Sequence, residues 1–379
     1  MNRRSFLHAS AAAVGASALS CAHVAPVPDA ETPLDLATLL EVLRTPGLAA
    51  QGTIQGRPFL HVAGVREVGK PDPVLPTTMF SAASLTKPVF TMAVRELVRS
   101  GRLEWHKPLQ DYAPLGLTGD AATITTGHVL SHGTGLPNWR FEAGAQLASA
   151  FPPGTRWQYS GEGYVLLQRV VEKLVGRPLG GFLNTVLLPS LGMTSSTFTW
   201  TPDVETKAVA GHDTQGRLLE RSAAFYVKGS HALIEKAGTT MDAVTYDQYI
   251  DIAQKAKSFA MPVAAIPNAA GSLWTTIGDY FSFVTQSIAD QAAHPDEYTA
   301  RNRVNAQISW ALSWGVDTSL GAPALFHWGD GPGVKNFVWW QPSTNTALVI
   351  FTNSDHGAPA YRVLMRRLLG ADPIAPEWV

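Results

Sequence analysis

The chain has 379 residues, of which 45% are hydrophobic and 16% are charged, a composition typical of a globular protein and not of a disordered or fibrous one. Its 29 basic and 30 acidic residues nearly cancel, so its charge gives no reason to expect binding to nucleic acid or to an anionic membrane surface. The length allows one large domain or two ordinary ones.

The first 25 residues form a predicted export signal. Residues 2–7 read Asn-Arg-Arg-Ser-Phe-Leu, a twin-arginine pattern, and the run at 9–19 is small and apolar. That run is too short for a stable bilayer anchor, and no other stretch approaches the length of a membrane span. We therefore expect signal cleavage, a linker over residues 26–33, and a protein of the bacterial periplasm or otherwise exported to the cell envelope.

Cys21 is the single cysteine, and it lies at the end of the apolar run. No internal disulfide can therefore form. Residues 18–21 loosely resemble a lipoprotein processing site, with the leucine one place out of register. Lipid attachment at Cys21 and plain cleavage nearby both stay open, and the oligomeric state is not predicted.

The predicted secondary structure begins with a helix and a hairpin. Leucines at helical spacing predict a helix over 34–43, and β-prone runs follow at 48–54 and 59–65. Their connection, Gln55-Gly56-Arg57-Pro58, is typical of a hairpin turn.

The next predicted helix, opening near Ser84 and ending at Gly101, carries the chain's one Ser-x-x-Lys, Ser84-Leu85-Thr86-Lys87. Pro88 is tolerated only near a helix start, which places Ser84 in the first turn. Positions i and i+3 share a helix face, so Lys87 can reach the Ser84 hydroxyl. A serine beside a lysine at a helix N-terminus is a candidate activated nucleophile. The same tetrapeptide is also common on ordinary surface helices, so the pattern alone does not decide.

From about residue 109 to 299 the chain is mainly helical with long loops, and helical patterns occur at 125–131, 164–175, 179–188 and 276–288. Thr245-Tyr246-Asp247-Gln248 is a capping-box start for an amphipathic helix that continues to Phe259. This helix lies in a loop-rich segment, residues 216–267. Two interpretations stay open: a surface helix packed on the domain, or a lid over a cleft.

After about residue 309 the pattern changes to short strands, at 310–316, 325–328, 337–340 and 348–352, and a final helix covers 359–369. Short connections favour antiparallel neighbours. We therefore predict an α+β fold in which both termini build a central antiparallel sheet of about five strands, flanked by helices. A single domain would cover 34–379, with its α/β part at about 34–108 and 300–379 and an inserted helical part at about 109–299.

Three separated motifs are more specific in combination than each is alone. They are Ser84-Leu85-Thr86-Lys87, Tyr159-Ser160-Gly161 and His327-Trp328-Gly329. Their order and spacing resemble the serine β-lactamase and penicillin-binding-protein superfamily, above all class C β-lactamases, D-aminopeptidases and family VIII carboxylesterases. Supporting stretches at 130–137 and 267–274 agree with this resemblance, which covers about residues 34–369. It implies the β-lactamase/transpeptidase-like fold and a serine hydrolase.

The resemblance also implies a role for each motif. Ser84 would attack a small-molecule acyl substrate and form an acyl-enzyme, with Lys87 and Tyr159 sharing the proton transfers. This fits the chemistry, because a serine hydroxyl needs a base to react. The oxyanion hole would consist of the backbone N–H groups of Ser84 and Asp330, and Gly329 would let the substrate lie close to the strand.

Two departures from the family pattern concern the substrate. The second motif usually ends in an asparagine that contacts the substrate amide, whereas this chain has Gly161. The third usually begins with a lysine, a permanent cation, whereas this chain has His327. Histidine as a residue type titrates near neutral pH and donates fewer hydrogen bonds than lysine. Both departures favour ester or small-amide cleavage over efficient penicillin hydrolysis. A packing role for His327 against Trp328 stays open.

No metal-ligand spacing, nucleotide-binding glycine motif or Gly-x-Ser-x-Gly occurs, so we expect no metal, no cofactor and no α/β-hydrolase elbow. His128 and His132 are assigned to structure. The favoured function is an exported serine hydrolase of esters or small peptide-like amides. A β-lactamase or D-alanyl carboxypeptidase, an acyltransferase, and a catalytically inactive binding homologue are the alternatives.

Overall fold

The computed structural model describes residues 35–140, 146–257 and 266–379. Asp35–Val379 form one compact unit. The predicted signal, the linker and Cys21 lie outside the described residues, as does the predicted end of the amphipathic helix at Phe259.

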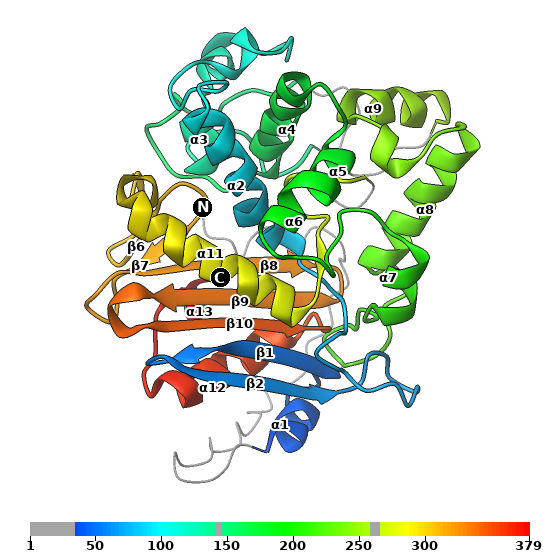
Figure 1. The fold of residues 1–379 in the computed structure, drawn as a ribbon, viewed down its shortest axis with the longest axis vertical. Coiled ribbons are helices and arrows are strands. Elements are labelled where there is room, and N and C mark those ends of the chain that lie inside the picture. The colour runs from blue at the N-terminus through cyan, green and yellow to red at the C-terminus, as the bar shows by residue number, and fades with distance from the viewer. Residues whose placement is uncertain (1–34, 141–145, 258–265) are drawn as a thin grey trace, which may run out of the picture. The chain divides into compact units, whose positions relative to one another are not determined.

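An eight-stranded antiparallel sheet is built from both ends of the unit, in the order β2-β1-β10-β9-β8-β7-β6-β5 (Figure 1). The two ends meet where β1 pairs with β10, with Leu48 opposite Thr352. The strands are β1 (Gly47–Ile54), β2 (Arg57–Gly64), β5 (Asn302–Arg303), β6 (Ile308–Trp310), β7 (Gly315–Asp317), β8 (Ala324–Gly331), β9 (Val334–Gln341) and β10 (Thr346–Thr352). The predicted α+β fold is confirmed, but the sheet is larger than the expected five or so strands.

Burial follows position in the sheet. Every residue of the central strand β10 is buried, as expected for a continuous apolar run covered on both faces. The edge strand β2 is half-buried or exposed along its length, and its Pro58 is tolerated because an edge strand has unpaired positions. Helix α11 (Ile277–Ala293) covers one face of the sheet and α12 (Gly357–Leu369) lies against the other (Figure 1).

The apolar run at 310–316 forms two strands and not the single predicted one. Ser313 adopts a φ of 71° and donates its N–H to the Leu130 carbonyl at 2.7 Å. Ala311 N–H bonds the Trp314 carbonyl at 2.8 Å, which closes the turn between β6 and β7. All four residues of this turn, 311–314, are buried. The sequence therefore stays apolar through the turn except for Ser313, so the pattern does not mark its position.

Helices make up most of the rest of the unit. Helix α2 (Thr86–Arg99) is buried over most of its length and runs through the centre of the unit (Figure 1). A second, two-stranded sheet pairs β3 (Phe80–Ser81) with β4 (Trp274–Thr275). A π-helical turn, Leu183–Leu187, joins α5 to α6. The remaining described helices are α1 (Leu36–Val42), α3 (Thr126–Leu130), α4 (Gly161–Val175), α5 (Leu179–Phe182), α6 (Leu188–Ser190), α7 (Pro202–Lys207), α8 (Ala223–Lys236), α9 (Tyr246–Lys255) and α13 (Ala375–Trp378).

The amphipathic helix predicted from Thr245 is α9, and its capping box forms as expected between Thr245 and Gln248. It packs with α8 and α4 around a small apolar core of its own. The buried Glu172 carboxylate on α4 accepts the Leu179 N–H and the Tyr246 N–H, each at 3.1 Å, and burial raises its pKa. These bonds cap α5 and α9 and tie both to α4, which favours the packed surface helix over a lid.

Candidate active site

Ser84 is presented by a tight turn just before α2. It lies in a 3₁₀ turn, Ala83–Leu85, that runs directly into α2 at Thr86, so the α-helix itself begins two residues later than predicted. Ala83 has a φ of 47°, a left-handed conformation that a residue with a side chain rarely adopts and that costs free energy. Within residues 78–91 only Ser84 is not buried. The strained turn therefore exposes one hydroxyl in an otherwise buried segment.

Lys87 lies one turn further along and is fully buried. Its Nζ is 3.0 Å from Ser84 Oγ and donates to the Ala270 carbonyl at 2.7 Å. Burial holds the pKa of the Lys87 ammonium well below its usual range, because a charged amine is costly away from water. No ion pair among the described residues includes Lys87 to offset this effect. The neutral amine can therefore accept a proton from Ser84.

Tyr159 lies over Lys87. The lysine Nζ is 5.0 Å from the centroid of the Tyr159 ring and 5.5 Å from that of Tyr164. The Tyr159 ring also packs against Trp328 of β8, with centroids 5.1 Å apart, and lies 6.3 Å from the His327 ring. The structure thus brings together the three residues that the motifs suggested for catalysis.

Strand β8 passes directly beside the turn that carries Ser84. A Cβ added at Gly329 would lie 2.3 Å from the Ala82 carbonyl oxygen, so only glycine lets the strand come this close. The Asn336 side-chain amide on the neighbouring β9 donates to the Ser81 carbonyl at 2.9 Å. This contact holds the hairpin of β8 and β9 against the Ser84 segment.

His327 and Asp330 project from β8 in different ways. The His327 ring is fully buried, stacks on Trp328 at 5.3 Å, and lies edge-on to Trp310 at 5.5 Å. Its Nδ1 is 2.8 Å from the Trp328 backbone N. The Asp330 carboxylate is exposed and forms an ion pair with Lys335 across the hairpin. The sequence hypothesis concerns only the backbone N–H of Asp330, which directly follows Gly329 on β8.

His132, assigned only to structure by sequence reasoning, holds the Tyr159 segment in place. Its carbonyl accepts the Gln158 N–H at 2.7 Å, and its Nδ1 accepts the Ser160 N–H at 3.2 Å. Its buried ring faces the Tyr159 ring, with centroids 4.1 Å apart. His132 thus holds the residues on both sides of Tyr159 by hydrogen bonds and packs against the Tyr159 ring itself. His132 and Tyr159 lie on separate loops that meet in the fold, so no local sequence pattern predicts this contact.

We expect His132→Ala to lower kcat about 10- to 100-fold, because a tyrosine displaced by about an ångström transfers its proton poorly. Labelling of Ser84 by a fluorophosphonate would continue, only more slowly. His128→Ala is the matched control: His128 lies on α3, which ends two residues before His132, and it forms the capping box of α3 with Thr125. Steady-state kinetics and thermal melting of both variants test this. Equal losses of activity would mean that His132 acts only through fold stability.

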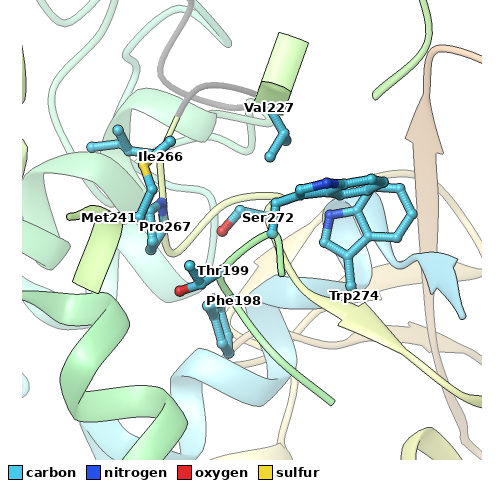
Figure 2. A pocket seen from close by; sticks show the side chains of 9 residues that line it. Phe198, Thr199, Val227, Met241, Ile266, Pro267, Ser272 and Trp274 are labelled. Atoms are coloured by element: carbon cyan, nitrogen blue, oxygen red, sulfur yellow. The ribbon is translucent and has the colours of Figure 1, made fainter. Parts of the chain in front are cut away.

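A small apolar pocket lies close to the loop that receives the Lys87 hydrogen bond. Ser272, two residues after Ala270, is one of its lining residues (Figure 2). The indole rings of Trp200 and Trp274 pack edge-to-face at 4.9 Å on one side of it. Met241, Ile266 and Pro267 lie across from these rings, and Val227 of α8 comes from the top of the view (Figure 2). Phe198 and Thr199 complete the lining.

The arrangement can be compared with known families. A sequence model of the β-lactamase family matches residues 36–371. The chain belongs to the β-lactamase family. The matched range contains all three motifs whose order and spacing resemble this family. No helix in the described part of the chain is long and apolar enough to cross a membrane. Among the described residues no group of three or more His, Cys, Asp or Glu side chains could hold a metal ion.

Individual relatives differ in how much of the protein they match. Esterase EstB of Burkholderia gladioli is 33% identical over 181 residues, which cover 40% of this chain and 45% of EstB. Penicillin-binding protein 4 of Amycolatopsis lactamdurans is 25% identical over 369 residues, 87% of each chain. The crystal structure of a β-lactamase/D-alanine carboxypeptidase from Pseudomonas syringae superposes with a TM-score of 0.68 at 16% identity, covering 90% of this chain and 100% of that one. The match to EstB spans under half of that relative, and the structural match shows the fold alone.

Proposed function

We propose that this β-lactamase-family protein hydrolyses esters and small amides through an acyl-enzyme on Ser84, with Lys87 and Tyr159 transferring protons. The observation that carries the proposal is the 3.0 Å contact between Ser84 Oγ and Lys87 Nζ, formed by a lysine whose pKa burial lowers. Lowering the pKa of this lysine favours its neutral form, and only the neutral amine can act as the base that a serine nucleophile requires.

The proposed steps account for each proton. Ser84 Oγ attacks the acyl carbonyl as its proton passes to Lys87 Nζ. The bond to the leaving group breaks, and Tyr159 relays that proton to the leaving oxygen or nitrogen, which departs with it. Water then attacks the acyl carbon, the ester bond to Ser84 Oγ breaks, and a proton from the water passes through the same groups to Ser84 Oγ as the acid is released. The negative charge on the carbonyl oxygen would be stabilised by the N–H groups of Ser84 and Asp330, of the kind that forms oxyanion holes.

The choice of esters over β-lactams rests on Gly161 and His327. Gly161 has no side chain to bind a substrate amide, and His327 replaces a permanent cation with a fully buried imidazole. The partial match to Esterase EstB supports esters, whereas the longer match to a penicillin-binding protein supports the alternative in which the protein reacts with penicillin-like compounds.

Intact-mass detection of adducts tests the proposal. The protein is incubated with p-nitrophenyl esters, D-amino-acid amides, a penicillin and a cephalosporin, and peptide mapping locates any adduct. We expect ester-derived adducts on Ser84 that turn over rapidly, and weak or slow adducts with the β-lactams. Fast cephalosporin turnover without ester turnover would reverse this order. No adduct with any compound would favour an inactive binding homologue, and acyl transfer to an added alcohol would identify an acyltransferase.

We further propose that residues 1–25 direct export of the folded protein by the twin-arginine route to the cell envelope. The Arg3-Arg4 pair followed by a short apolar run supports this proposal. Fractionation of bacteria expressing the full chain, together with the mass of the mature N-terminus, tests it and reports whether Cys21 carries lipid. Retention of uncleaved protein in the cytoplasm would contradict it.

A further inference from the structure

The third residue of the second motif, Gly161, is covered by an indole ring. A Cβ built on Gly161 would lie 2.2 Å from Cζ2 and from Cη2 of Trp139. Real Cβ contacts are essentially never shorter than 3.0 Å, so any side chain at this position must displace the ring. The Trp139 indole thus occupies the space that an asparagine at 161 would need.

The residues on both sides of Trp139 are bonded to the first turn of α4. Asn138 accepts the Gly161 N–H at its carbonyl, 3.1 Å, and at Oδ1, 2.9 Å, and its carbonyl also accepts the Glu162 N–H at 3.1 Å. Arg140 N–H donates to Glu162 Oε1 at 2.8 Å, and the guanidinium pairs with Oε2 at 3.0 Å. Glu162 is buried. The position of the indole is therefore fixed by the same helix start that follows Tyr159.

The rest of the indole lies between two parts of the protein. Trp139 is half-buried and packs both against the main core and against the small core that includes Val165 of α4 and Tyr246 of α9. The indole covers Gly161, which is two residues after Tyr159 in the second motif. It presents an apolar surface at a position where the family pattern places a hydrogen-bonding amide.

We propose that Trp139 determines acyl-group specificity: its indole forms an apolar wall beside the acylation site and selects alkyl or aryl acyl groups over acylamino ones. The inference rests on the proposed function and narrows it. An acylamino group placed against an indole loses its hydrogen bonds to water without replacement, whereas an alkyl group gains contact. On this proposal, residue 161 is glycine because the Trp139 indole leaves no room for a side chain there.

The test compares two esters with the same leaving group, p-nitrophenyl butyrate and the p-nitrophenyl ester of N-acetylglycine. In Trp139→Ala we expect kcat/KM for the butyrate to fall about tenfold, mainly through KM, with the acetylglycine ester changed less than about threefold. Trp139→Phe, which keeps an apolar wall, would retain most of the wild-type preference. Trp105→Ala, another half-buried tryptophan on the main core, is the matched control and leaves the ratio unchanged.

Gly161→Ala tests the same point without removing the indole. Alanine is the better helix former at this position, so the helix is not weakened, but the added methyl must push Trp139 aside. We expect the preference for butyrate to fall in the same direction as in Trp139→Ala. The double variant Gly161→Asn with Trp139→Ala would raise kcat/KM for the acetylglycine ester about tenfold over Trp139→Ala.

The two proposals fail in different ways. Unchanged substrate ratios in Trp139→Ala and Gly161→Ala, with Ser84 still labelled by a fluorophosphonate, would overturn the specificity role and leave the proposed function intact. A wild-type protein that neither labels nor turns over either ester would overturn the proposed function, and the specificity role with it. Thermal melting of each variant separates these outcomes from unfolding.

Discussion

Ser84→Ala is expected to lower kcat for a p-nitrophenyl ester at least about 10⁴-fold and to abolish labelling by a fluorophosphonate. Removing a nucleophile that forms a covalent intermediate eliminates the acyl-enzyme pathway, and only binding and charge stabilisation remain to accelerate attack by water. Alanine is smaller than serine and creates no overlap in the turn at 83–85. The melting temperature should therefore stay close to that of the wild type.

The measurement needs a serine control from the same segment of the chain. Ser84 precedes α2, and the exposed Ser100 is the C-cap that directly follows it; the Ser100 hydroxyl donates to carbonyls of the last turn of α2. Ser100→Ala should label and turn over like the wild type. Wild-type turnover by Ser84→Ala would instead show that another group carries the reaction.

Strands at the two ends of the chain could be predicted because their apolar runs are short and bounded by turn residues. The paired strands β1 and β2, and β8 to β10, all lie where the pattern placed them. The turn inside 310–316 could not be predicted, because the left-handed Ser313 is stabilised by a hydrogen bond to Leu130, far away in the sequence. Helix α8 was missed because exposed Phe225 and Tyr226 and the internal Gly229 blur its apolar periodicity.

In the candidate site too, some contacts could be predicted from the sequence and others could not. The contact between Ser84 and Lys87 follows from helical spacing alone, so sequence was sufficient for it. The approach of Tyr159 was suggested only by family resemblance, because it depends on how the loop before α4 packs. His132 contacts that loop, and the Trp139 indole covers Gly161. Each contact joins residues more than twenty positions apart in the sequence, so no spacing rule predicts it.

Lys87→Met is expected to remove activity and to change how stability depends on pH. Methionine has nearly the same length but no basic nitrogen, so Ser84 loses its base and kcat/KM should fall about 10³-fold or more. In the wild type, kcat/KM should rise with pH through the lowered pKa of Lys87, since only the neutral amine accepts the proton. The acid limb would therefore lie well below the usual range of a lysine.

The sign of the stability effect follows from linkage. Because burial lowers the pKa of Lys87 only in the folded state, the unfolded chain binds a proton that the folded one does not, between that lowered pKa and 10.5. Wild-type stability is therefore reduced by this lysine at neutral pH and recovers as the pH rises toward 10.5. The Lys87→Met variant loses the hydrogen bonds to the Ala270 carbonyl and the Ser84 hydroxyl, each worth about 1 kcal/mol, so the pH dependence of the difference in stability is the diagnostic quantity.

Urea unfolding of the wild type and Lys87→Met at several pH values between about 6 and 10 measures this difference. We expect the stability of the wild type to rise relative to Lys87→Met across the series. Lys173→Met, at an exposed lysine in the last turn of α4, is the matched control and should show no such trend. Parallel curves for all three proteins would mean that Lys87 keeps an ordinary pKa in the fold. Since the proposed mechanism needs a neutral lysine beside Ser84, that result would also remove Lys87 as its base.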